Sequence, residues 1–230
     1  MPRQPYPLKD GTNAPGVTTI VGQLGKGESL MNWAHKEGYE GTIELIKRWF
    51  NDPTHRVDEL VIPDYEEIAT WQSKRDSAGA KGTDVHKLIM DFLSGEEIII
   101  PGDRITKRCF QKFLKWWGKQ KELHNMTLIT ETPMVSEILR CGGTPDIWVV
   151  EIKRRIDIKT GGKWIYDDWW YQLAGYDLLG EENDQKAEEH QILWLPKDNQ
   201  FDAPIRTELE REKRIFRHLL AIYKERNDKG

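Results

Sequence analysis

The chain has 230 residues, of which 38% are hydrophobic and 31% are charged, and this is enough for one well-buried globular domain. Its formal net charge of −4 argues weakly against a protein that coats nucleic acid. No apolar run could span a membrane and no secretory signal opens the sequence, so we expect a cytoplasmic protein without a membrane partner.

Two cysteines, Cys109 and Cys141, stand far apart in the sequence. This excludes a zinc knuckle or a four-cysteine iron–sulphur cluster built from this chain alone, and we expect both to be reduced thiols. The sequence also lacks a Walker A motif, which excludes a helicase motor domain in this chain.

The first half of the chain predicts helices. Residues 1–16 are rich in Pro and Gly and predict an extended arm, while residues 17–21 predict either a short strand or the lead-in to a helix. Further helices are expected after Ser29, around residues 43–50, over 64–92 with a candidate break at 79–82, and over 104–121.

The second half predicts a sheet. Strands are expected over residues 128–131, 146–150 and 156–159, and the charged residues 153–155 suggest a hairpin between the last two. A helix around 169–179, a strand over 190–195 and a final helix capped by Thr207 follow. This order predicts an α/β fold with a central mixed sheet flanked by helices. We expect one domain over 1–230, mainly helical over 1–125 and with the sheet over 126–230.

Two aspartates and a lysine carry the candidate chemistry. If residues 146–150 and 156–159 are paired strands, Asp146 and Asp157 can converge, and Asp157 and Lys159 share one face of their strand. Two carboxylates bind a hard divalent cation such as Mg²⁺ or Mn²⁺, which stabilises charge on a phosphate and lowers the pKa of a water molecule. The lysine can orient or deprotonate that water.

An Asp-x-Lys sequence in a strand belongs more often to a solvated sheet edge than to a catalytic site. In this chain Asp157 lies between Ile156 and Ile158, which predicts an enclosed strand. The apolar neighbours therefore favour the catalytic interpretation.

The segment Thr144-Pro145-Asp146, followed by Asp157-Ile158-Lys159, resembles the signature of the PD-(D/E)xK nuclease superfamily. It is most similar to the RecB-type exonuclease branch, which includes phage exonucleases and the mitochondrial genome maintenance exonuclease. Three more segments resemble motifs of that branch, namely Gly82–His86, Asp157–Gly161 and Gln172–Tyr176. Without a cysteine cluster, the chain is similar to the stand-alone members.

The resemblance implies a restriction-endonuclease-like core and a deoxyribonuclease that uses Mg²⁺ or Mn²⁺. It implies that Asp146 and Asp157 hold the metal, that His86 and the carbonyl group of Ile158 are further ligands, and that Lys159 serves the attacking water. An isolated histidine is otherwise more often structural, so the role of His86 depends on the neighbouring carboxylates.

Three other residues have two interpretations each. Gln172 and Tyr176 are four apart on a predicted helix, where they either pack the helix or, as the resemblance implies, position the lysine, the water or the substrate phosphate. Glu131 ends a predicted strand. Its side chain either contacts the site or lies outside it, and the sequence favours neither alternative.

The predicted helix over 104–121 carries a run of basic residues without an acid. One face holds Arg104, Arg108, Lys112, Lys115 and Lys119, which form either a solvated face or a ridge that tracks DNA phosphates; the nuclease motifs favour the ridge. Residues 153–155 have the same two interpretations. Trp164, Trp169 and Trp170 either pack in the core or stack on unpaired bases.

We therefore expect a metal-dependent DNA exonuclease of replication, recombination or repair, similar to phage-encoded enzymes that act in a bacterial host. One rival is a structure-selective or site-specific endonuclease of the same fold. The other is a non-catalytic DNA-binding module of a larger complex, which has no need of carboxylates beside phosphate. The sequence predicts neither the polarity of digestion, nor a preference for single or double strands, nor the oligomeric state.

Overall fold

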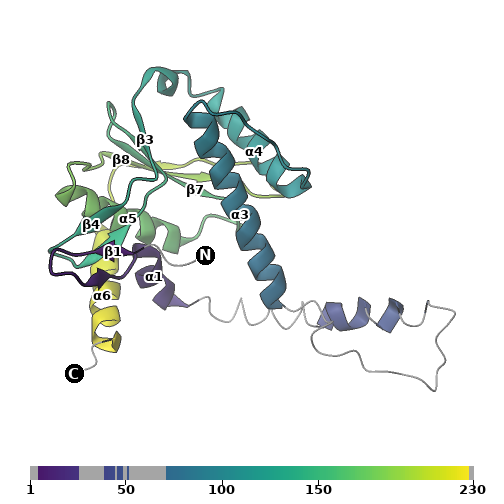
Figure 1. Cartoon of the computed structure of the whole chain (residues 1–230), viewed down its shortest axis with the longest axis horizontal. Coiled ribbons are helices and arrows are strands. Elements are labelled where there is room, and N and C mark those ends of the chain that lie inside the picture. Colours follow the sequence, from purple (N-terminus) through teal and green to yellow (C-terminus); the bar gives the residue numbers. More distant parts are fainter. Residues whose placement is uncertain (1–4, 26–38, 45, 49–50, 52–70, 228–230) are drawn as a thin grey trace. The chain divides into compact units, whose positions relative to one another are not determined.

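The computed structural model describes residues 5–25, 39–44, 46–48, 51 and 71–227 (Figure 1). The chain divides into two compact units, one of residues 1–24 and 82–230 and one of residues 25–81. In the second unit, residues 39–44, 46–48, 51 and 71–81 are helical. The helix predicted after Ser29 and the first part of the one predicted over 64–92 lie outside the described residues.

A five-stranded mixed sheet forms the centre of the larger unit and confirms the predicted α/β class. In sheet order, the first strand pairs antiparallel with the second and the second pairs antiparallel with the third. The third and fourth strands are parallel, and the fourth and fifth are antiparallel. In sheet order they are β3 (Leu128–Thr130), β6 (Ile147–Val149), β7 (Arg154–Lys159), β8 (Glu189–Trp194) and β9 (Ile205–Arg206).

Strand β7 lies in the middle of this sheet, and its alternating side chains point to two different layers. Ile156 and Ile158 belong to the apolar core on one face. Asp157 and Lys159 point to the other face, toward helix α5 (Asp167–Glu182). Helix α5 connects β7 to β8, because parallel neighbours need a crossover connection.

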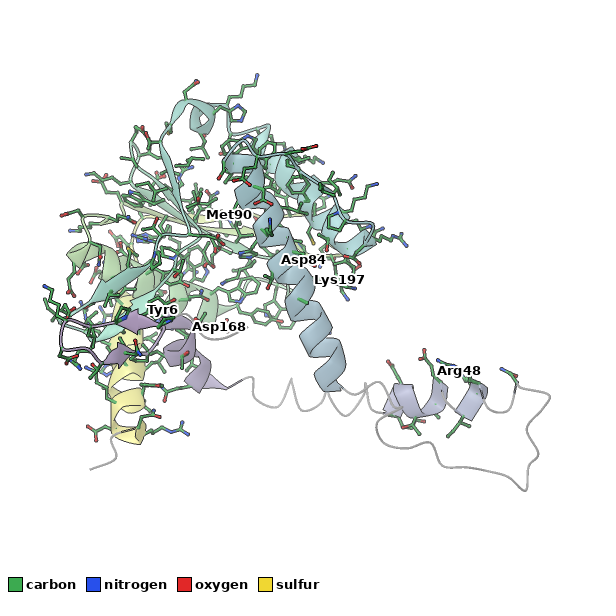
Figure 2. All side chains as sticks on the ribbon, viewed as in Figure 1. Tyr6, Arg48, Asp84, Met90, Asp168 and Lys197 are labelled. Atoms are coloured by element: carbon green, nitrogen blue, oxygen red, sulfur yellow. The ribbon has the colours of Figure 1, made fainter. Side chains whose placement is uncertain are left out.

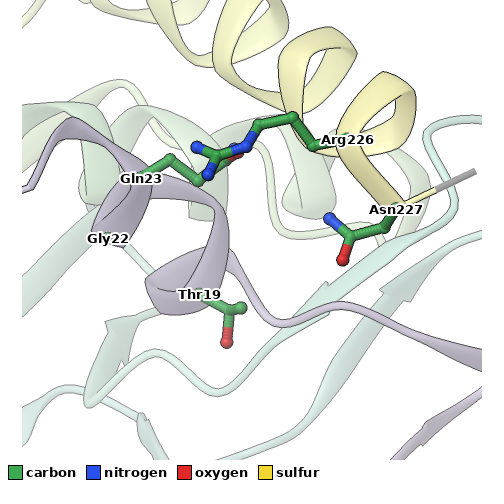
Figure 3. A pocket seen from close by; sticks show the side chains of 5 residues that line it. All are labelled: Thr19, Gly22, Gln23, Arg226 and Asn227. Carbon is green, nitrogen blue, oxygen red and sulfur yellow. The ribbon is translucent and has the colours of Figure 1, made fainter.

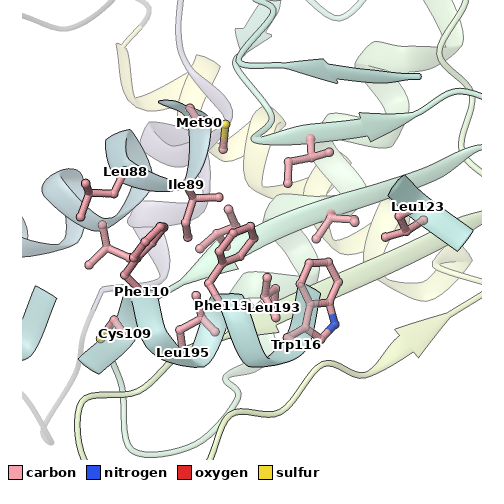
Figure 4. Packing of buried hydrophobic residues seen from close by; sticks show 14 of the residues in the cluster. Leu88, Ile89, Met90, Cys109, Phe110, Phe113, Trp116, Leu123, Leu193 and Leu195 are labelled. Carbon is pink, nitrogen blue, oxygen red and sulfur yellow. The ribbon is translucent and has the colours of Figure 1, made fainter. Parts of the chain in front are cut away.

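Helices α3 (Trp71–Leu93) and α4 (Arg104–Trp117) supply the apolar side chains that cover the first face of the sheet. Figure 4 shows Ile89 of α3 and Phe113 of α4 facing Leu193 of β8, and all three are buried. Burial of side chains of this size stabilises the fold by about 1.5–3 kcal/mol each.

Two predicted boundaries on these helices are wrong. Helix α3 runs without a break through residues 79–82, because a glycine costs a helix only about 1 kcal/mol. Helix α4 ends at Trp117 rather than at residue 121. The N–H of the next residue, Gly118, donates to the Leu114 carbonyl and closes the last turn. A short 3₁₀ helix, η4 (Lys121–Asn125), follows.

The opposite layer consists of α5, α1 (Val17–Val21) and α6 (Glu210–Asn227), which share one apolar cluster (Figure 1). The alternatives for residues 17–21 were a short strand and the lead-in to a helix; the segment is itself a short helix, so the strand is wrong. Helix α6 begins three residues later than predicted, because its first intrahelical bond runs from the Lys213 N–H to the Leu209 carbonyl and does not involve Thr207.

Two short hairpins accompany this layer and were not predicted. They are β1 (Tyr6–Pro7) with β2 (Asn13–Ala14), and β4 (Met134–Ser136) with β5 (Cys141–Gly143). Strands of two or three residues are too short to show an alternating pattern in the sequence, which explains why they were missed.

A buried ion cluster ties α5, β8 and α6 together. Asp177 Oδ2 lies 2.6 Å from Lys213 Nζ and 3.2 Å from His190 Nε2. Burial raises the pKa of Asp177, but the close polar contacts with His190 and Lys213 outweigh burial and hold this pKa well below its usual range. Loss of one partner from such a buried pair typically costs about 3–5 kcal/mol.

Both cysteines are free, as predicted, and the structure buries both of them. Burial raises the pKa of the Cys141 thiol to about 12. Within the described ranges, no helix is both long enough and apolar enough to cross a membrane.

Candidate active site

Three acidic residues occupy one row across the sheet. Ile147 of β6 pairs with Ile156 of β7, so the next position sets Asp146 opposite Asp157. The N–H of Glu131, just after β3, donates to the Asp146 carbonyl at 3.0 Å and extends the row to a third strand. Cα atoms directly opposite one another in antiparallel strands lie about 4.5–5.5 Å apart, so the predicted convergence of the two aspartates follows from strand register.

Asp146 is held from two sides. Its Oδ2 accepts a hydrogen bond of 2.6 Å from the N–H of Ile158, and its Oδ1 lies 3.4 Å from Nδ1 of His86 on α3. Burial would raise the pKa of Asp146, but His86 outweighs burial and the pKa is lowered. Burial would likewise lower the pKa of His86, but Asp146 raises it. Without a metal ion, His86 and Asp146 thus each favour the charged form of the other.

Asp157 begins a chain of polar contacts that leads into α5. Lys159 Nζ lies 2.8 Å from Asp157 Oδ2 and donates to Gln172 Oε1 at 2.9 Å. Gln172 Nε2 in turn donates to the Tyr176 hydroxyl at 2.8 Å. The structure therefore brings together Asp157, Lys159, Gln172 and Tyr176, four of the residues that the sequence motifs single out.

The Asp157 carboxyl is 2% exposed, and its environment opposes ionisation. Burial raises its pKa to about 6, the neighbouring Asp146 adds to the shift, and Lys159 opposes it. Burial also raises the pKa of Tyr176 well above its usual value, so this hydroxyl is protonated at neutral pH. Two carboxyl groups this close to each other titrate as a pair.

Small residues allow large side chains to reach the site. A Cβ atom on Gly143 would lie 2.6 Å from Tyr176 Cε1, and one on Gly82 would lie 3.1 Å from Thr160 Oγ1. The Tyr6 ring, labelled in Figure 2, occupies the space above Gly142, where a Cβ would lie 2.3 Å from Tyr6 Cγ. These contacts were not predicted, although Gly142-Gly143 just before Thr144-Pro145-Asp146 was a visible signal.

The donor set at this row suits a hard divalent cation. Asp157 Oδ2 is buried and accepts no hydrogen bond with good geometry, although Lys159 Nζ lies 2.8 Å away. In the described part of the chain, no group of three or more His, Cys, Asp and Glu side chains is arranged to hold a metal. Two carboxylates nevertheless fit Mg²⁺, which is commonly bound by one or two carboxylates together with substrate phosphates and water.

Glu131 reaches the row through its backbone alone. Its φ angle of 44° lies in the left-handed region, so its side chain does not follow the regular alternation of the strand, and this side chain is exposed. Whether Glu131 contributes to the site remains a prediction.

The basic face predicted on residues 104–121 is only partly a free surface. Arg104, Arg108 and Lys115 are exposed on α4. Lys112 instead donates to the carbonyl groups of Pro196 and Asn199, and so holds the loop after β8. Lys119 lies beyond the end of α4, with Nζ 5.7 Å from the centre of the Phe201 ring.

A basic residue that the sequence analysis did not select, Lys197, joins this face (Figure 2). It lines a hollow of about 320 Å³ together with Arg108, Gln111, Lys112, Lys115 and Asp198. The Leu195 N–H donates to the Lys159 carbonyl at 2.7 Å, so the loop that carries Lys197 starts at the end of the sheet where β7 ends. Lys197 was missed because it is isolated in the sequence.

The predicted hairpin between β6 and β7 is confirmed, but a basic patch at its tip is not. Lys153 pairs with Glu188 at 2.6 Å, and Arg154 pairs with Glu189 at 2.6 Å. Arg155 is fully buried, where its guanidinium donates to the Gln185 carbonyl and lies 5.2 Å from the Trp148 ring. Arg154 and Arg155 belong to β7 rather than to the turn, so residues 153–155 serve the fold.

A second hollow, of about 450 Å³, lies away from the carboxylate row (Figure 3). It is lined by residues near the C-terminal ends of α1 and α6, namely Thr19, Gly22, Gln23, Arg226 and Asn227. None of them was predicted for the site, so the size of a hollow does not mark the chemistry in this molecule.

Fold and site together define a class: an α/β protein whose central sheet carries two opposed aspartates and a lysine. No protein-family model and no curated protein matches the sequence. Among solved structures, the chain is similar to a candidate exonuclease from Eubacterium rectale, with a TM-score of 0.45 and 13% identity over 64% of this chain and 65% of the other. The similarity therefore spans slightly less than two thirds of that protein's length.

Two further solved structures are similar at lower scores. A phage-related exonuclease from Haemophilus somnus 129PT has a TM-score of 0.35 and 14% identity over 61% of this chain and 79% of the other. An alkaline exonuclease from Laribacter hongkongensis has a TM-score of 0.35 and 16% identity over 62% and 80%, and it has also been solved in complex with dAMP.

Proposed function

We propose that this chain is a metal-dependent deoxyribonuclease that removes nucleotides from the ends of DNA. The observation that carries the proposal is Asp146 opposite Asp157, with Lys159 beside Asp157 and hydrogen-bonded to Gln172. Buried carboxylates next to a fixed ammonium group are costly for stability, which favours a catalytic role over a structural one.

Asp146 and Asp157 are the residues that would hold Mg²⁺ or Mn²⁺, with His86 and the Ile158 carbonyl as further ligands. Either ion supplies positive charge that stabilises the phosphate during attack and lowers the pKa of water. A cation beside Asp157 would also favour its ionised form and so reverse the effect of burial on its pKa.

Lys159 is the residue we assign to the attacking water. An ammonium group has three N–H donors; Lys159 donates one of them to Gln172 Oε1, and its Nζ also lies 2.8 Å from Asp157 Oδ2 in an ion pair, so that two of the donors serve these contacts at most. The third remains for a water molecule or a phosphate oxygen. The side chain is 17% exposed, so its ammonium group is fixed but can still be reached by a substrate.

Gln172 and Tyr176 act as positioning residues in this proposal. Gln172 accepts from Lys159 and donates to the Tyr176 hydroxyl, and Tyr176 packs against Gly143 just before the Thr144-Pro145-Asp146 segment. The two residues thereby couple the orientation of the lysine to the strand that leads to Asp146.

The DNA backbone is proposed to cross the exposed cations of α4 and the loop after β8. Arg108, Lys115 and Lys197 line one hollow, and phosphates are bound by cations of this kind. Lys112 is assigned to holding the loop instead, because two carbonyl groups already accept from it.

An endonuclease of the same fold and a non-catalytic DNA-binding module are the rival functions. Hydrolysis of end-labelled linear DNA and of covalently closed circular DNA, each with Mg²⁺ or with EDTA, separates all three. An exonuclease releases nucleotides from the linear DNA alone, an endonuclease also cuts the circle, and a binding module cuts neither.

Lys159→Ala is expected to abolish this hydrolysis while the thermal unfolding midpoint and DNA binding change little, because the lysine acts on the water and not in the core. Lys153→Ala is the matched control, since Lys153 forms an ion pair with Glu188 on the hairpin and should leave hydrolysis unchanged. Near-normal cleavage by Lys159→Ala would contradict the assignment.

A further inference from the structure

The loop that leads from Lys159 to α5 is held in place at several points. The Gly161 carbonyl accepts a hydrogen bond of 2.8 Å from Trp194 Nε1. Gly162 has a φ angle of 80°, and a Cβ there would lie 2.6 Å from Tyr166 Cε2 and 3.0 Å from Trp169 Cη2. The backbone of this loop therefore lies directly against two aromatic rings, in a conformation that favours glycine.

Trp164, in this loop, is an exposed tryptophan. Its side chain is 59% exposed, whereas the other tryptophans with described side chains are buried or half-buried. The Trp164 ring contacts the Tyr166 ring at 5.3 Å between centroids, and the Tyr166 ring meets Trp169 edge-on at 5.2 Å. The exposed Trp164 ring is thus supported by the Tyr166 ring, which in turn contacts Trp169, and this limits the entropy that Trp164 would lose on binding.

Trp164 lies near the candidate catalytic residue Lys159 in the sequence. It follows Lys159 by five positions in the sequence, and five extended residues span at most about 18 Å. At the other end of the aromatic group, Trp169 precedes Gln172 by three positions on α5, where residues lie next to each other on the helix surface. A strand of DNA bound at Lys159 would therefore pass Trp164 within a few nucleotides.

We propose that Trp164 stacks on an unpaired base of the DNA strand that enters the site, and that the site therefore selects single-stranded or frayed ends. The proposal rests on the proposed function and names the substrate class of that site. A base inside a duplex has both faces covered by its neighbours, whereas an unpaired base at a single-stranded or frayed end offers a face to the ring. The exposed Lys163 next to it adds a positive charge for the adjoining phosphate.

Binding is measured separately from hydrolysis. Fluorescence anisotropy with a labelled short oligothymidylate in EDTA gives the affinity of the wild type, Trp164→Ala and Trp164→Phe. Loss of one base–aromatic stack is expected to weaken binding by Trp164→Ala roughly 5- to 150-fold. Trp164→Phe should retain most of the affinity, and Ile138→Ala, which removes another exposed apolar side chain, should retain all of it.

A fully abasic strand of the same length provides the decisive comparison. It carries the same phosphates without bases, so Trp164→Ala should change its affinity by less than about twofold. An equal loss on both strands would overturn the stacking proposal, because the tryptophan would then act on the backbone or on the fold. An unchanged affinity of Trp164→Ala for oligothymidylate would overturn it as well.

Hydrolysis of the same oligonucleotide with Mg²⁺ tells the two proposals apart. If the wild type binds through Trp164 but releases no nucleotides, the nuclease assignment fails and the base contact stands. If the wild type cleaves and Trp164→Ala binds and cleaves equally well, the base contact fails and the nuclease assignment stands.

Discussion

Asp157 illustrates at the scale of one residue how the proposed catalytic arrangement conflicts with stability. The carboxyl is almost fully buried, lies opposite a second carboxylate, and has a pKa raised to about 6 by burial first and by Asp146 next. A residue selected for stability alone would be apolar at this central position of β7. The cost of these buried carboxylates therefore supports the metal-binding role proposed for them.

Asp157→Asn is expected to stabilise the protein at neutral pH in EDTA. A carboxyl whose folded pKa lies above its unfolded value takes up a proton on folding, so its favourable contribution is complete near pH 4 and is lost as pH rises from about 4 to 6. Asparagine does not titrate, so the variant should gain on the order of 1–3 kcal/mol at about pH 7 and nothing near pH 4. Urea unfolding at both pH values measures this difference.

Asp146→Asn provides the matched control for this experiment. The pKa of Asp146 is lowered because His86 outweighs burial, so its substitution should destabilise at neutral pH rather than stabilise. Equal effects of the two substitutions, or a gain for Asp157→Asn that does not depend on pH, would contradict the assigned origin of the shift. Neither variant should hydrolyse DNA.

Helix α5 joins the candidate chemistry to the fold at the scale of one element. One side of it carries Gln172 and Tyr176 to Lys159, while Asp177 binds Lys213 of α6. Between them, Gly175 allows α1 and α6 to approach, since a Cβ there would lie 2.7 Å from Phe216 Cε2 and 2.8 Å from Val17 Cγ1. The position of the lysine therefore depends on how three helices pack.

Gly175→Ala is expected to lower the free energy of unfolding by about 1–3 kcal/mol, because the added methyl group overfills this contact. Gly22→Ala is its control: Gly22 has a right-handed helical conformation, and a Cβ there meets nothing within 4 Å. Chemical denaturation of both variants gives the comparison. A Gly175→Ala protein as stable as the wild type would mean that the helices can separate without cost.

Charge is distributed unevenly at the scale of the whole molecule. The chain has 34 Lys and Arg against 38 Asp and Glu, which gives the net charge of −4. Arg108, Lys115 and Lys197 nevertheless line one hollow beside a single acid, Asp198. A protein that is acidic overall can thus still present a cationic surface to DNA, because binding responds to local charge.

Joint substitution of Arg108, Lys115 and Lys197 by Gln is expected to weaken DNA binding and its dependence on salt. Each lost phosphate contact lowers the slope of log Kd against log salt concentration by about 0.7–0.9, so the slope should fall by about 2–3. Lys153→Gln, which removes a cation already paired with Glu188, should leave the slope unchanged. An unaltered slope in the triple variant would exclude this hollow from the DNA path.

The sequence by itself determined the features that depend on local pattern. Alternation around Ile156 and Ile158 predicted the enclosed central strand, and the spacing of Asp157 and Lys159 predicted that they share a face. The i,i+4 spacing of Gln172 and Tyr176 predicted their common side of α5. Local spacing is sufficient in these cases because strand and helix periods fix side-chain direction within a segment.

Tertiary structure alone decided which cationic side chains are exposed and which are engaged within the fold. Lys112 holds a loop, Arg155 is buried, and the isolated Lys197 joins the basic hollow, although nothing local in the sequence separates these three from other cations. The exposure of Trp164 and the hydrogen bond by which the Glu131 backbone extends the row of the two aspartates were decided in the same way. The physical reason is that burial and partners depend on strand register and on loops far apart in the chain, which no local period encodes.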